Sequence, residues 1–384
     1  MSGRETKVND EKETYTMKDF YNPLIGMDYP DPDLIRVGDI WYMISTTMHF
    51  MPGGEILRSY NLTDWERVGY VFDDLDHTPA QCMENGENIY GQGMWAASLR
   101  YHNGIFYVCF AANDTHRTYL YQSENIEGPW KKQYIEGFYH DCSLLFDDYR
   151  VYIVYGNTQI YITELTADLS SPKPGGLHRK IIEDTGNVRL GYEGAHAYKI
   201  NGKYYITCPA GGTEGWQICL RSDHIYGPYE HKLIMNDNSS YPPNGLHQGG
   251  MVELKNGDWW FMIMQDRGAI GRVPCLVPVE WIDGWPMLGK NGKDVITYRK
   301  PDVGKNFPIQ VPATTDEFNT QKLGLQWQWN HNPDPEKWSL KARKGYMRLK
   351  ASYAEDLKKA RNTLTQRVQG PSSEGTVELE VTGL

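Results

Sequence analysis

Three copies of a similar segment, far apart in the sequence, each open with a carboxylate. They begin at Asp31 (Asp-Pro-Asp-Leu-Ile), at Asp141 (Asp-Cys-Ser-Leu-Leu) and at Glu193 (Glu-Gly-Ala-His-Ala), and two further copies open at Trp95 and His247. A repeated segment of this kind is typical of folds in which equivalent units are arranged around a common axis. If equivalent positions meet at such an axis, the three acids share one pocket. Carboxyl groups gathered in this way could act as general acid and general base on a glycosidic bond.

Each copy contains two β-rich runs separated by a turn. The first run is apolar and the second is rich in aromatic residues. Residues 41–44 of the first copy and residues 259–262 of the fifth copy are examples of the second run. Three of the turns are Asn-Gly, at residues 103–104, 201–202 and 256–257. This pair favours hairpins because both central residues of a type I′ turn need positive φ. A second hairpin-like element follows in several copies, so the sequence predicts a five-bladed β-propeller. The alternative is a β-sandwich whose hairpins resemble one another by chance.

The repeats occupy residues 21–300, which are predicted to form the propeller and to carry the catalytic site. Residues 1–20 are polar and are expected to be a loose N-terminal arm. Prolines recur in residues 301–314, which we expect to be an extended linker. From residue 315, alternating runs predict a β-sandwich, and residues 315–384 would be only the N-terminal part of this truncated domain. The predicted fold class is therefore all-β.

The composition argues against several classes of partner. The 384 residues carry a formal net charge of −10 without any run of Lys or Arg, which argues against nucleic acid and anionic membranes. No apolar stretch approaches the roughly 18 residues of a membrane span, and the polar start shows no signal peptide. The six Cys have no paired spacing, so we expect small buried hydrophobes in a reducing setting. This favours a cytoplasmic location, or a secreted or periplasmic one if a signal has been removed.

Ordered motifs along nearly the whole chain resemble those of family-43 glycoside hydrolases. They are Asn22-Pro23-Leu24, Tyr29-Pro30-Asp31-Pro32-Asp33, Trp95-Ala96-Ala97-Ser98-Leu99, Asp141-Cys142-Ser143-Leu144, Glu193-Gly194-Ala195-His196 and Gly271-Arg272-Val273-Pro274. Residues 279–286 are similar to the segment that closes the propeller in the xylosidase and arabinofuranosidase members. Residues 316–384 resemble the front part of the lectin-like sandwich that those members carry.

The resemblance implies an inverting mechanism in which water is the nucleophile. Asp31 would be the general base, Glu193 the general acid and Asp141 a third acid, which orients Glu193 and keeps it protonated through its own negative charge. The two reacting carboxyl groups of an inverting enzyme stand roughly 6.5–9.5 Å apart. Asp33 follows the same turn as Asp31 and is expected to be structural. Hydrolysis of this kind requires no organic cofactor.

Five further residues are expected at the sugar-binding pocket. By the resemblance, Arg272 contacts sugar hydroxyls in the terminal subsite, and its forked guanidinium can hold two of them. Trp95 offers a ring that can stack on a sugar or form a pocket wall. Met48 and His49 stand where family xylosidases usually have an aromatic-acidic-aromatic run, and they are expected to shape the pocket for the terminal sugar. His247 is expected below the pocket, where calcium or a water cluster could bind, although calcium prefers oxygen ligands.

The sequence therefore predicts an inverting exo-glycosidase that releases terminal α-L-arabinofuranosyl or β-D-xylosyl residues from plant hemicellulose or its oligosaccharides. The departure at Met48 and His49 favours the arabinofuranoside, and a strict β-xylosidase is the first alternative. A non-catalytic carbohydrate-binding propeller would not need three axial acids. A retaining fructan-processing propeller would need an opening motif that Asp31-Pro32-Asp33 matches only in part. Sequence motifs of metalloproteases, serine hydrolases and nucleotide-binding folds are absent.

Overall fold

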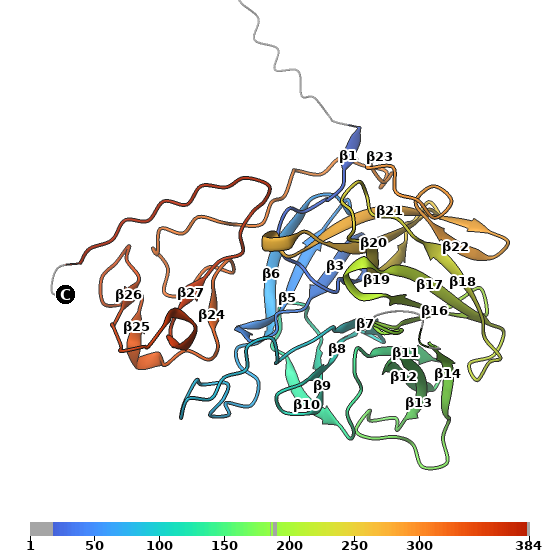
Figure 1. Ribbon diagram of the computed structural model, residues 1–384, viewed down its shortest axis with the longest axis horizontal. Helices are drawn as coiled ribbons and strands as arrows, with labels where there is room; N and C mark the ends of the chain where they lie inside the picture. The colour runs from blue at the N-terminus through green and yellow to red at the C-terminus, as the bar shows by residue number, and fades with distance from the viewer. Residues whose placement is uncertain (1–17, 185, 187–189, 382–384) are drawn as a thin grey trace, which may run out of the picture.

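A computed structural model describes residues 18–184, 186 and 190–381. Most of the predicted N-terminal arm, residues 1–17, lies outside this part of the chain. Within it, five sheets have four strands each, and the sheets follow one another along the sequence. Figure 1 shows them side by side as blades around a common centre. The predicted five-bladed propeller and the all-β fold class are confirmed.

Each blade is built from one continuous stretch of chain. Blade 1 contains β2 (Asp33–Val37), β3 (Ile40–Ser45), β5 (Gly53–Ser59) and β6 (Trp65–Phe72). Blade 2 contains β7 (Ser98–His102), β8 (Ile105–Ala112), β9 (Arg117–Ser123) and β10 (Lys131–Ile135). Blade 3 contains β11 (Ser143–Asp147), β12 (Arg150–Asn157), β13 (Gln159–Leu165) and β14 (His178–Glu183). Blade 4 contains β15 (His196–Ile200), β16 (Lys203–Ala210), β17 (Trp216–Ser222) and β18 (Glu230–Met235). Blade 5 contains β19 (Leu246–Glu253), β20 (Trp259–Asp266), β21 (Arg272–Ile282) and β22 (Trp285–Leu288).

Two of the three Asn-Gly pairs form the tight turns that the sequence predicts. Asn103 and Gly104, which join β7 to β8, both have positive φ, and so do Asn201 and Gly202 between β15 and β16. This is the backbone that a type I′ hairpin requires. The third pair lies in a longer loop between β19 and β20, where Gly257 donates a hydrogen bond to the carbonyl of Leu254 at 3.1 Å. The hairpin is present there, but its turn is wider than predicted.

In each of three inner strands, the side chain of the first residue accepts a hydrogen bond from a backbone N–H of the next blade. The pairs are Asp33 Oδ2 with Leu99 N (2.8 Å), Ser98 Oγ with Leu144 N (3.1 Å) and Ser143 Oγ with Ala197 N (2.9 Å). These inner strands therefore start at the same end of the propeller, which we call the front face. Asp33 is completely buried and also binds Arg100 at 2.6 Å, so its carboxylate is occupied by contacts between blades, in agreement with the expected structural role.

The N-terminal segment closes the ring by lying against blade 5. Among the described residues, β22 pairs with the end of β21 alone, so residues 272–278 need another partner on that side. The buried side-chain amide of Asn22 donates to the carbonyl of Leu276 (3.0 Å) and accepts from its N–H (2.9 Å). The N–H of Tyr29 donates to the carbonyl of Arg272 (2.9 Å). Further out, β1 (Asp19–Tyr21) pairs with β23 (Thr297–Arg299). We call these contacts of residues 19–29 with β21 and β23 the clasp. The clasp brings the start of blade 1 next to the start of β21.

Apolar side chains fill the space between neighbouring blades. Large buried members include Met43 and Phe261 between blades 1 and 5, and Ile44 and Phe110 between blades 1 and 2. All six Cys are buried and free of disulfides. The prediction that they are small buried hydrophobes is confirmed. In the residues that the structure describes, we find no helix long and apolar enough to cross a membrane.

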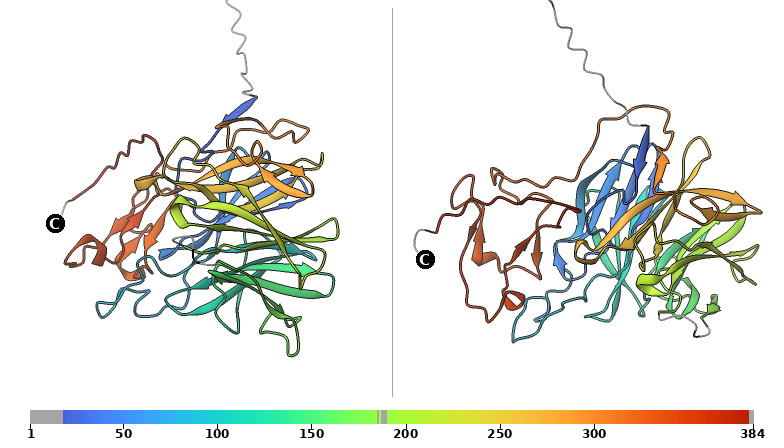
Figure 2. Two further views of the ribbon diagram at one scale, coloured as in Figure 1. Left: turned by 45° about the vertical axis from the view of Figure 1, so that its right-hand side comes forward. Right: turned by 45° about the horizontal axis from the view of Figure 1, so that its top comes forward.

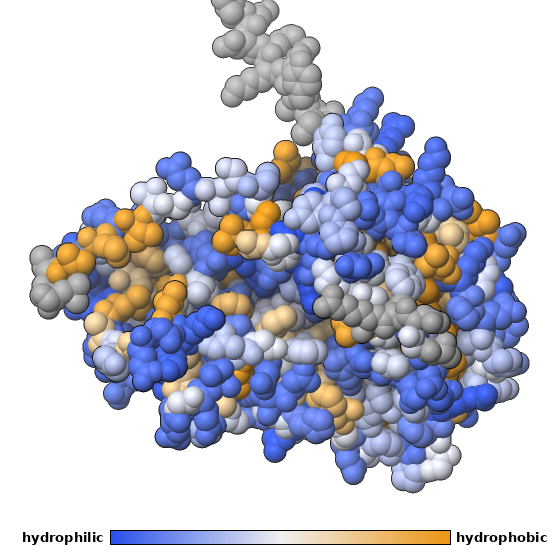
Figure 3. Space-filling model, in the orientation of Figure 1, coloured by the Kyte–Doolittle hydropathy of each residue, from blue (hydrophilic) through white to orange (hydrophobic). Residues whose placement is uncertain are grey.

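The C-terminal region extends from the side of blade 1. Its strands are β24 (Gln328–Asn330), β25 (Trp338–Ser339), β26 (Arg348–Leu349) and β27 (Leu364–Thr365). β24 pairs with β27 on one side and with β4 (Phe50–Met51), a short strand in the β3–β5 connection, on the other. Figure 2 shows this red region beside the blue blade in both views. The surface is largely hydrophilic over the propeller, while Figure 3 shows apolar residues along the C-terminal segment, where Val377 and Leu379 are exposed.

Candidate active site

The three predicted acids lie on the front face, each just before an inner strand. Asp31 stands two residues before β2, and Asp141 stands two residues before β11. Glu193 stands three residues before β15, so it occupies the position of His140 rather than that of Asp141. The prediction that the three acids hold one equivalent position is therefore wrong by one residue. The acids instead occupy two adjacent positions at the entrances of three blades.

A left-handed backbone turns the chain into these strands. The φ angles are 51° at Asp31, 46° at Asp141 and 52° at Gly194, which are the three equivalent positions. For an aspartate this conformation costs about 1–3 kcal/mol and persists only where the surroundings enforce it. At Gly194 a side chain would also meet Gln248, because a Cβ there would lie 2.6 Å from the Gln248 carboxamide. The glycine after Glu193 thus adopts this conformation without strain, and a side chain there would require Gln248 to move.

Asp31 is buried and is held by two donors from different blades. Thr46, which follows β3, donates its hydroxyl to Asp31 Oδ2 at 2.7 Å. Arg272, the first residue of β21, donates from Nη1 to Oδ1 at 3.1 Å. The carboxylates of Asp31 and Asp266 raise the pKa of Arg272, so this guanidinium stays charged. Asp31 is therefore oriented by one neutral and one cationic donor.

Asp141 and Glu193 share His140 as a neighbour. His140 Nε2 lies 3.7 Å from Asp141 Oδ1 and 3.9 Å from Glu193 Oε2. Asn157, at the end of β12, donates from Nδ2 to Glu193 Oε2 at 2.8 Å. The Asp141 side chain is 7% exposed and that of Glu193 is 19% exposed. Glu193 is thus the member of this cluster that a substrate can reach more easily.

Burial and neighbouring charges shift the pKa values of Asp141 and His140. Burial, followed by the charges of Glu193 and Asp31, raises the pKa of Asp141 well above its usual range, and the charge of His140 opposes the rise. Burial lowers the pKa of His140, but the neighbouring carboxylates of Glu193, Asp141 and Asp31 raise it overall. Among the described residues, none hydrogen-bonds to Asp141 Oδ1 or His140 Nε2. The cluster therefore combines a buried acid of high proton affinity with a basic imidazole.

Two of the remaining predicted residues adjoin side chains that surround these acids. Trp95 donates its indole N–H to the carbonyl of Gly91 at 3.0 Å and places its ring edge-on to His140, with centroids 5.5 Å apart. His247 is buried, and its Nε2 lies 3.3 Å from Asp266 Oδ2. Asp266 in turn contacts Arg272. His247 thus belongs to the group of side chains behind Arg272.

The loop with Met48 and His49 has two different environments. Met48 helps to line a cavity of about 330 Å³ between the front of blade 1 and the C-terminal region, together with Arg367. His49 is buried against Tyr90 (4.8 Å between centroids) and His331 (5.1 Å). Burial lowers the pKa of His49 to about 4, so its ring is neutral. His49 therefore contacts the C-terminal region, and Met48 is left to face the cavity.

Metal ligation has one geometric candidate in the described part of the chain. His140, Asp141 and Glu193 offer ligand atoms that all lie within 4.8 Å of one another. These are the side chains that the reaction itself would use. Calcium prefers several oxygen ligands, whereas the carboxylate next to His247 is already shared with Arg272. Calcium at His247 stays a prediction.

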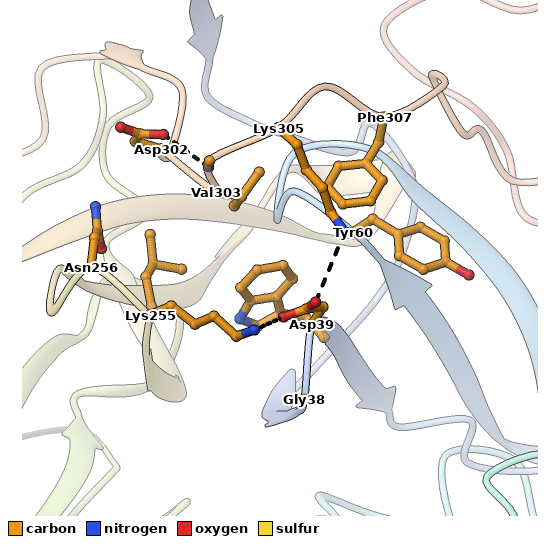
Figure 4. A pocket seen from close by; sticks show the side chains of 12 residues that line it. Gly38, Asp39, Tyr60, Lys255, Asn256, Asp302, Val303, Lys305 and Phe307 are labelled. Carbon is orange, nitrogen blue, oxygen red and sulfur yellow. Dashed lines mark hydrogen bonds and ion pairs between the residues drawn. The ribbon is translucent and has the colours of Figure 1, made fainter.

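Another cavity, of about 470 Å³, lies at the opposite end of the propeller. Its walls come from the turn between β2 and β3, the loop between β19 and β20, and residues 302–307. Figure 4 shows Asp39 pairing with Lys255 and Lys305 across it. The inner strands end at this face, so the cavity is remote from the acids.

Sequence reasoning missed Thr46, His140 and Asn157. A signal existed for His140, because aligning the copies on their strand starts, and not on their carboxylates, would have placed it with Trp95 and Glu193. Thr46 and Asn157 follow or end the second strand of their blades. Nothing in the sequence distinguishes them from other polar residues at strand ends.

Comparisons with known proteins agree with this architecture. Residues 20–286 match the model of glycosyl hydrolases family 43, and residues 315–384 match the beta xylosidase C-terminal concanavalin A-like domain. A beta-xylosidase of Formosa agariphila is 34% identical, over 95% of this chain and 71% of that protein. A non-reducing end alpha-L-arabinofuranosidase of Bacteroides ovatus is 31% identical, over 87% of this chain and 65% of that protein.

Solved structures share the fold. A bifunctional GH43-CE protein of Bacteroides eggerthii superposes with a TM-score of 0.84 and 43% identity, over 92% of this chain and 46% of that one. This chain thus spans about half the length of that bifunctional protein. The family resemblance predicted from the motifs is confirmed at the level of sequence and of fold. The chain belongs to glycosyl hydrolase family 43, in the group whose members include β-xylosidases and α-L-arabinofuranosidases.

Proposed function

We propose that the protein is an inverting exo-glycosidase that releases terminal α-L-arabinofuranosyl or β-D-xylosyl residues from hemicellulose or its oligosaccharides. The observation that carries the proposal is the difference between two carboxylates on the front face. Asp31 is buried and held by Thr46 and Arg272, whereas Glu193 is partly exposed and held by Asn157. An inverting enzyme needs two such carboxyl groups with separate tasks.

Asp31 acts as the general base in this proposal. Its two donors hold the carboxylate in one orientation, so that a lone pair can accept a proton from the attacking water. Arg272 contributes in two ways, because it orients Asp31 and offers remaining N–H groups to sugar hydroxyls. The water attacks the anomeric carbon from the face opposite the leaving group, and the product has the inverted configuration.

Glu193 acts as the general acid and protonates the leaving oxygen. The amide of Asn157 fixes one carboxyl oxygen of Glu193 and leaves the other for the substrate. Asp141 interacts with the charges of both Glu193 and Asp31, and it positions the acid together with His140. Because Asp141 is buried, its effect on the reaction passes through these neighbours.

The choice between the two sugars rests on the loop after β3. The curated relatives include both a beta-xylosidase and an arabinofuranosidase, so the family leaves this choice open. The Met48 side chain lines the cavity beside Asp28 and Arg367. Family xylosidases usually have an aromatic-acidic-aromatic run in this loop, whereas here it carries Met48 and His49, and His49 packs against His331 of the C-terminal region. We therefore place the arabinofuranoside first and a strict β-xylosidase second.

The test compares nitrophenyl arabinofuranoside and xyloside with the corresponding unactivated oligosaccharides. Glu193→Ala should lose about 10²–10⁴-fold in kcat on oligosaccharides, and less on nitrophenyl glycosides, whose leaving group needs little protonation. Asp31→Asn should be nearly inactive on both. Asp148→Asn, at an exposed turn of blade 3, serves as the control with wild-type rates.

Three results would overturn the proposal. Wild-type rates for Glu193→Ala on the oligosaccharides would remove the acid assignment. Proton NMR of the first product should show the inverted anomer, and a retained anomer would exclude the single-displacement mechanism. A wild-type protein that binds xylan but hydrolyses no terminal pentoside would be a carbohydrate-binding propeller.

A further inference from the structure

A row of aromatic rings leads from the acids outward over blade 2. Trp95 lies edge-on to His140, and His140 lies 6.5 Å from Phe138, measured between centroids. Phe138 then stacks on His116 with centroids 4.1 Å apart and ring planes inclined by 13°. We call these four side chains the aromatic row. Its inner end is part of the acid cluster, since His140 Nε2 is 3.9 Å from Glu193 Oε2.

The outer end of the row lies on the same face of the propeller as the acids. β7 starts at the front face, so its antiparallel neighbour β8 ends there, and His116 follows in the connection to β9. By the same alternation β10 ends at the front face, and Phe138 follows in the connection to β11. The row ends at a hollow of about 560 Å³, whose walls include Arg117 and Glu136. The hollow thus lies on the front face.

The two loops that carry the outer rings are held rigidly. His116 has a φ of 53°, and Gly137, next to Phe138, has a φ of 112°. The hydroxyl of Thr118 donates to the carbonyl of Gly137 at 3.0 Å and accepts from the N–H of Tyr139 at 2.9 Å. These bonds tie the start of β9 to the loop before β11. Left-handed conformations at non-glycine residues are retained where the surrounding structure enforces them, often at binding sites.

The position of Glu193 says which part of a substrate would meet these rings. In the proposed function Glu193 gives its proton to the leaving oxygen, so the leaving part of the substrate lies on the side of Glu193. The aromatic row begins on that side, at His140. Sugar rings present apolar C–H faces that pack on aromatic rings, while their hydroxyls can bond to polar groups such as Arg117 and Glu136.

We propose that the aromatic row, with the hollow at its outer end, binds the leaving-group side of the substrate, and that this part is a chain of neutral β-linked pentose units such as a xylo-oligosaccharide. The inference rests on the proposed function. It also goes beyond it, because a pocket for one terminal sugar needs no platform outside the acids. The platform makes the enzyme favour a pentose on a long chain over the same pentose on a small aglycone.

The experiment measures kcat/KM for oligosaccharides of increasing length and for a nitrophenyl pentoside. The readout is the ratio of kcat/KM between a long oligosaccharide and the nitrophenyl compound. In the wild type this ratio should rise with chain length. In the double variant His116→Ala, Phe138→Ala it should fall by roughly threefold to tenfold, mainly through KM, because about 1 kcal/mol of stacking is lost with the long substrate.

A stacked pair at the opposite end of blades 2 and 3 supplies the control. His102, the last residue of β7, stacks on Phe146 of β11 with centroids 4.5 Å apart. His102→Ala should leave the ratio at its wild-type value. An unchanged ratio in the double variant, or an equal fall in the control, would overturn the aromatic row while the glycosidase assignment stands. Absence of any pentosidase activity in the wild type would overturn the proposed function itself, and the row with it.

Discussion

At the scale of single residues, the acids of the front face differ through their surroundings and not through their chemical type. Asp31 receives two hydrogen bonds, whereas Asp141 is buried beside two other carboxylates. A buried carboxyl group near like charges favours its protonated form. Such an arrangement opposes the stability of the folded protein at neutral pH, and it is retained where a reaction uses it.

The first prediction concerns the loss of folding stability that ionisation of the buried Asp141 causes. Its pKa is raised from the ordinary 3.8 to about 7, first of all by burial. The folded state therefore holds this proton more tightly than the unfolded state, and the folded state loses stability as pH rises through that interval. Asp141→Asn, which cannot ionise, should raise the free energy of unfolding by about 1–3 kcal/mol near pH 8.

Urea unfolding at several pH values measures this effect. The gain should shrink as pH falls and vanish near about pH 4, where the carboxyl is protonated in both states. Asp148→Asn, at an exposed turn of the same blade, should change stability little at any pH. A variant Asp141→Asn that is less stable than the wild type at high pH would show that Asp141 is stabilised as an anion.

At the scale of elements, the sequence allows the strands and most turns to be predicted, because alternation and Asn-Gly pairs are local signals. The positions of the three acids at the strand entrances could be predicted as well, since each acid precedes an apolar run of its own repeat. The one-residue offset of Glu193 and the role of His140 depend on where each strand starts, which the carboxylate pattern does not encode. The direction of His49 depends on the pairing of β4 with β24, in which Asn330 lies opposite Phe50 from a distant part of the sequence. Partners this distant leave no local pattern.

The second prediction concerns the clasp that closes the ring. Asn22 replaces a missing strand partner by bonding both backbone groups of Leu276. Asn22→Ala would leave a buried N–H and a buried C=O without a partner, which costs about 2–4 kcal/mol in the free energy of unfolding. Thermal and urea unfolding check the value. Asn256→Ala, in the exposed loop between β19 and β20, is the matched control and should cost less than about 0.5 kcal/mol. Equal losses in the two variants would mean that the hydrogen bonds of Asn22 stabilise the fold no more than those of an exposed loop.

At the scale of the whole molecule, the C-terminal region and the propeller are joined at the front of blade 1. β24 adds to β4, and Arg367 forms a buried ion pair with Glu55 of β5. His331 is completely buried between the two parts, where its Nε2 accepts from the N–H of Ile89 at 2.9 Å. The loop after Ile89 leads to Trp95, so the C-terminal region supports a wall of the candidate site from behind.

The third prediction follows from the titration of this junction. Burial, and then the nearby His49, lowers the pKa of His331 from 6.5 to about 4. Between these values the unfolded state takes up a proton that the folded state refuses, so stability falls as pH drops from about 6.5 toward 4. His331→Gln keeps an acceptor for the N–H of Ile89 and does not titrate. Between about pH 7 and pH 5 the wild type should therefore lose roughly 1–2 kcal/mol more than this variant. The free energy of unfolding, measured at both pH values, gives the difference directly.

The controls separate this effect from other titrating groups. Asp141 has the opposite pH dependence, but its contribution is common to both proteins and cancels. His231→Gln, exposed on β18, should behave like the wild type, and a loss as large in His331→Gln as in the wild type would show that His331 is charged in the folded protein.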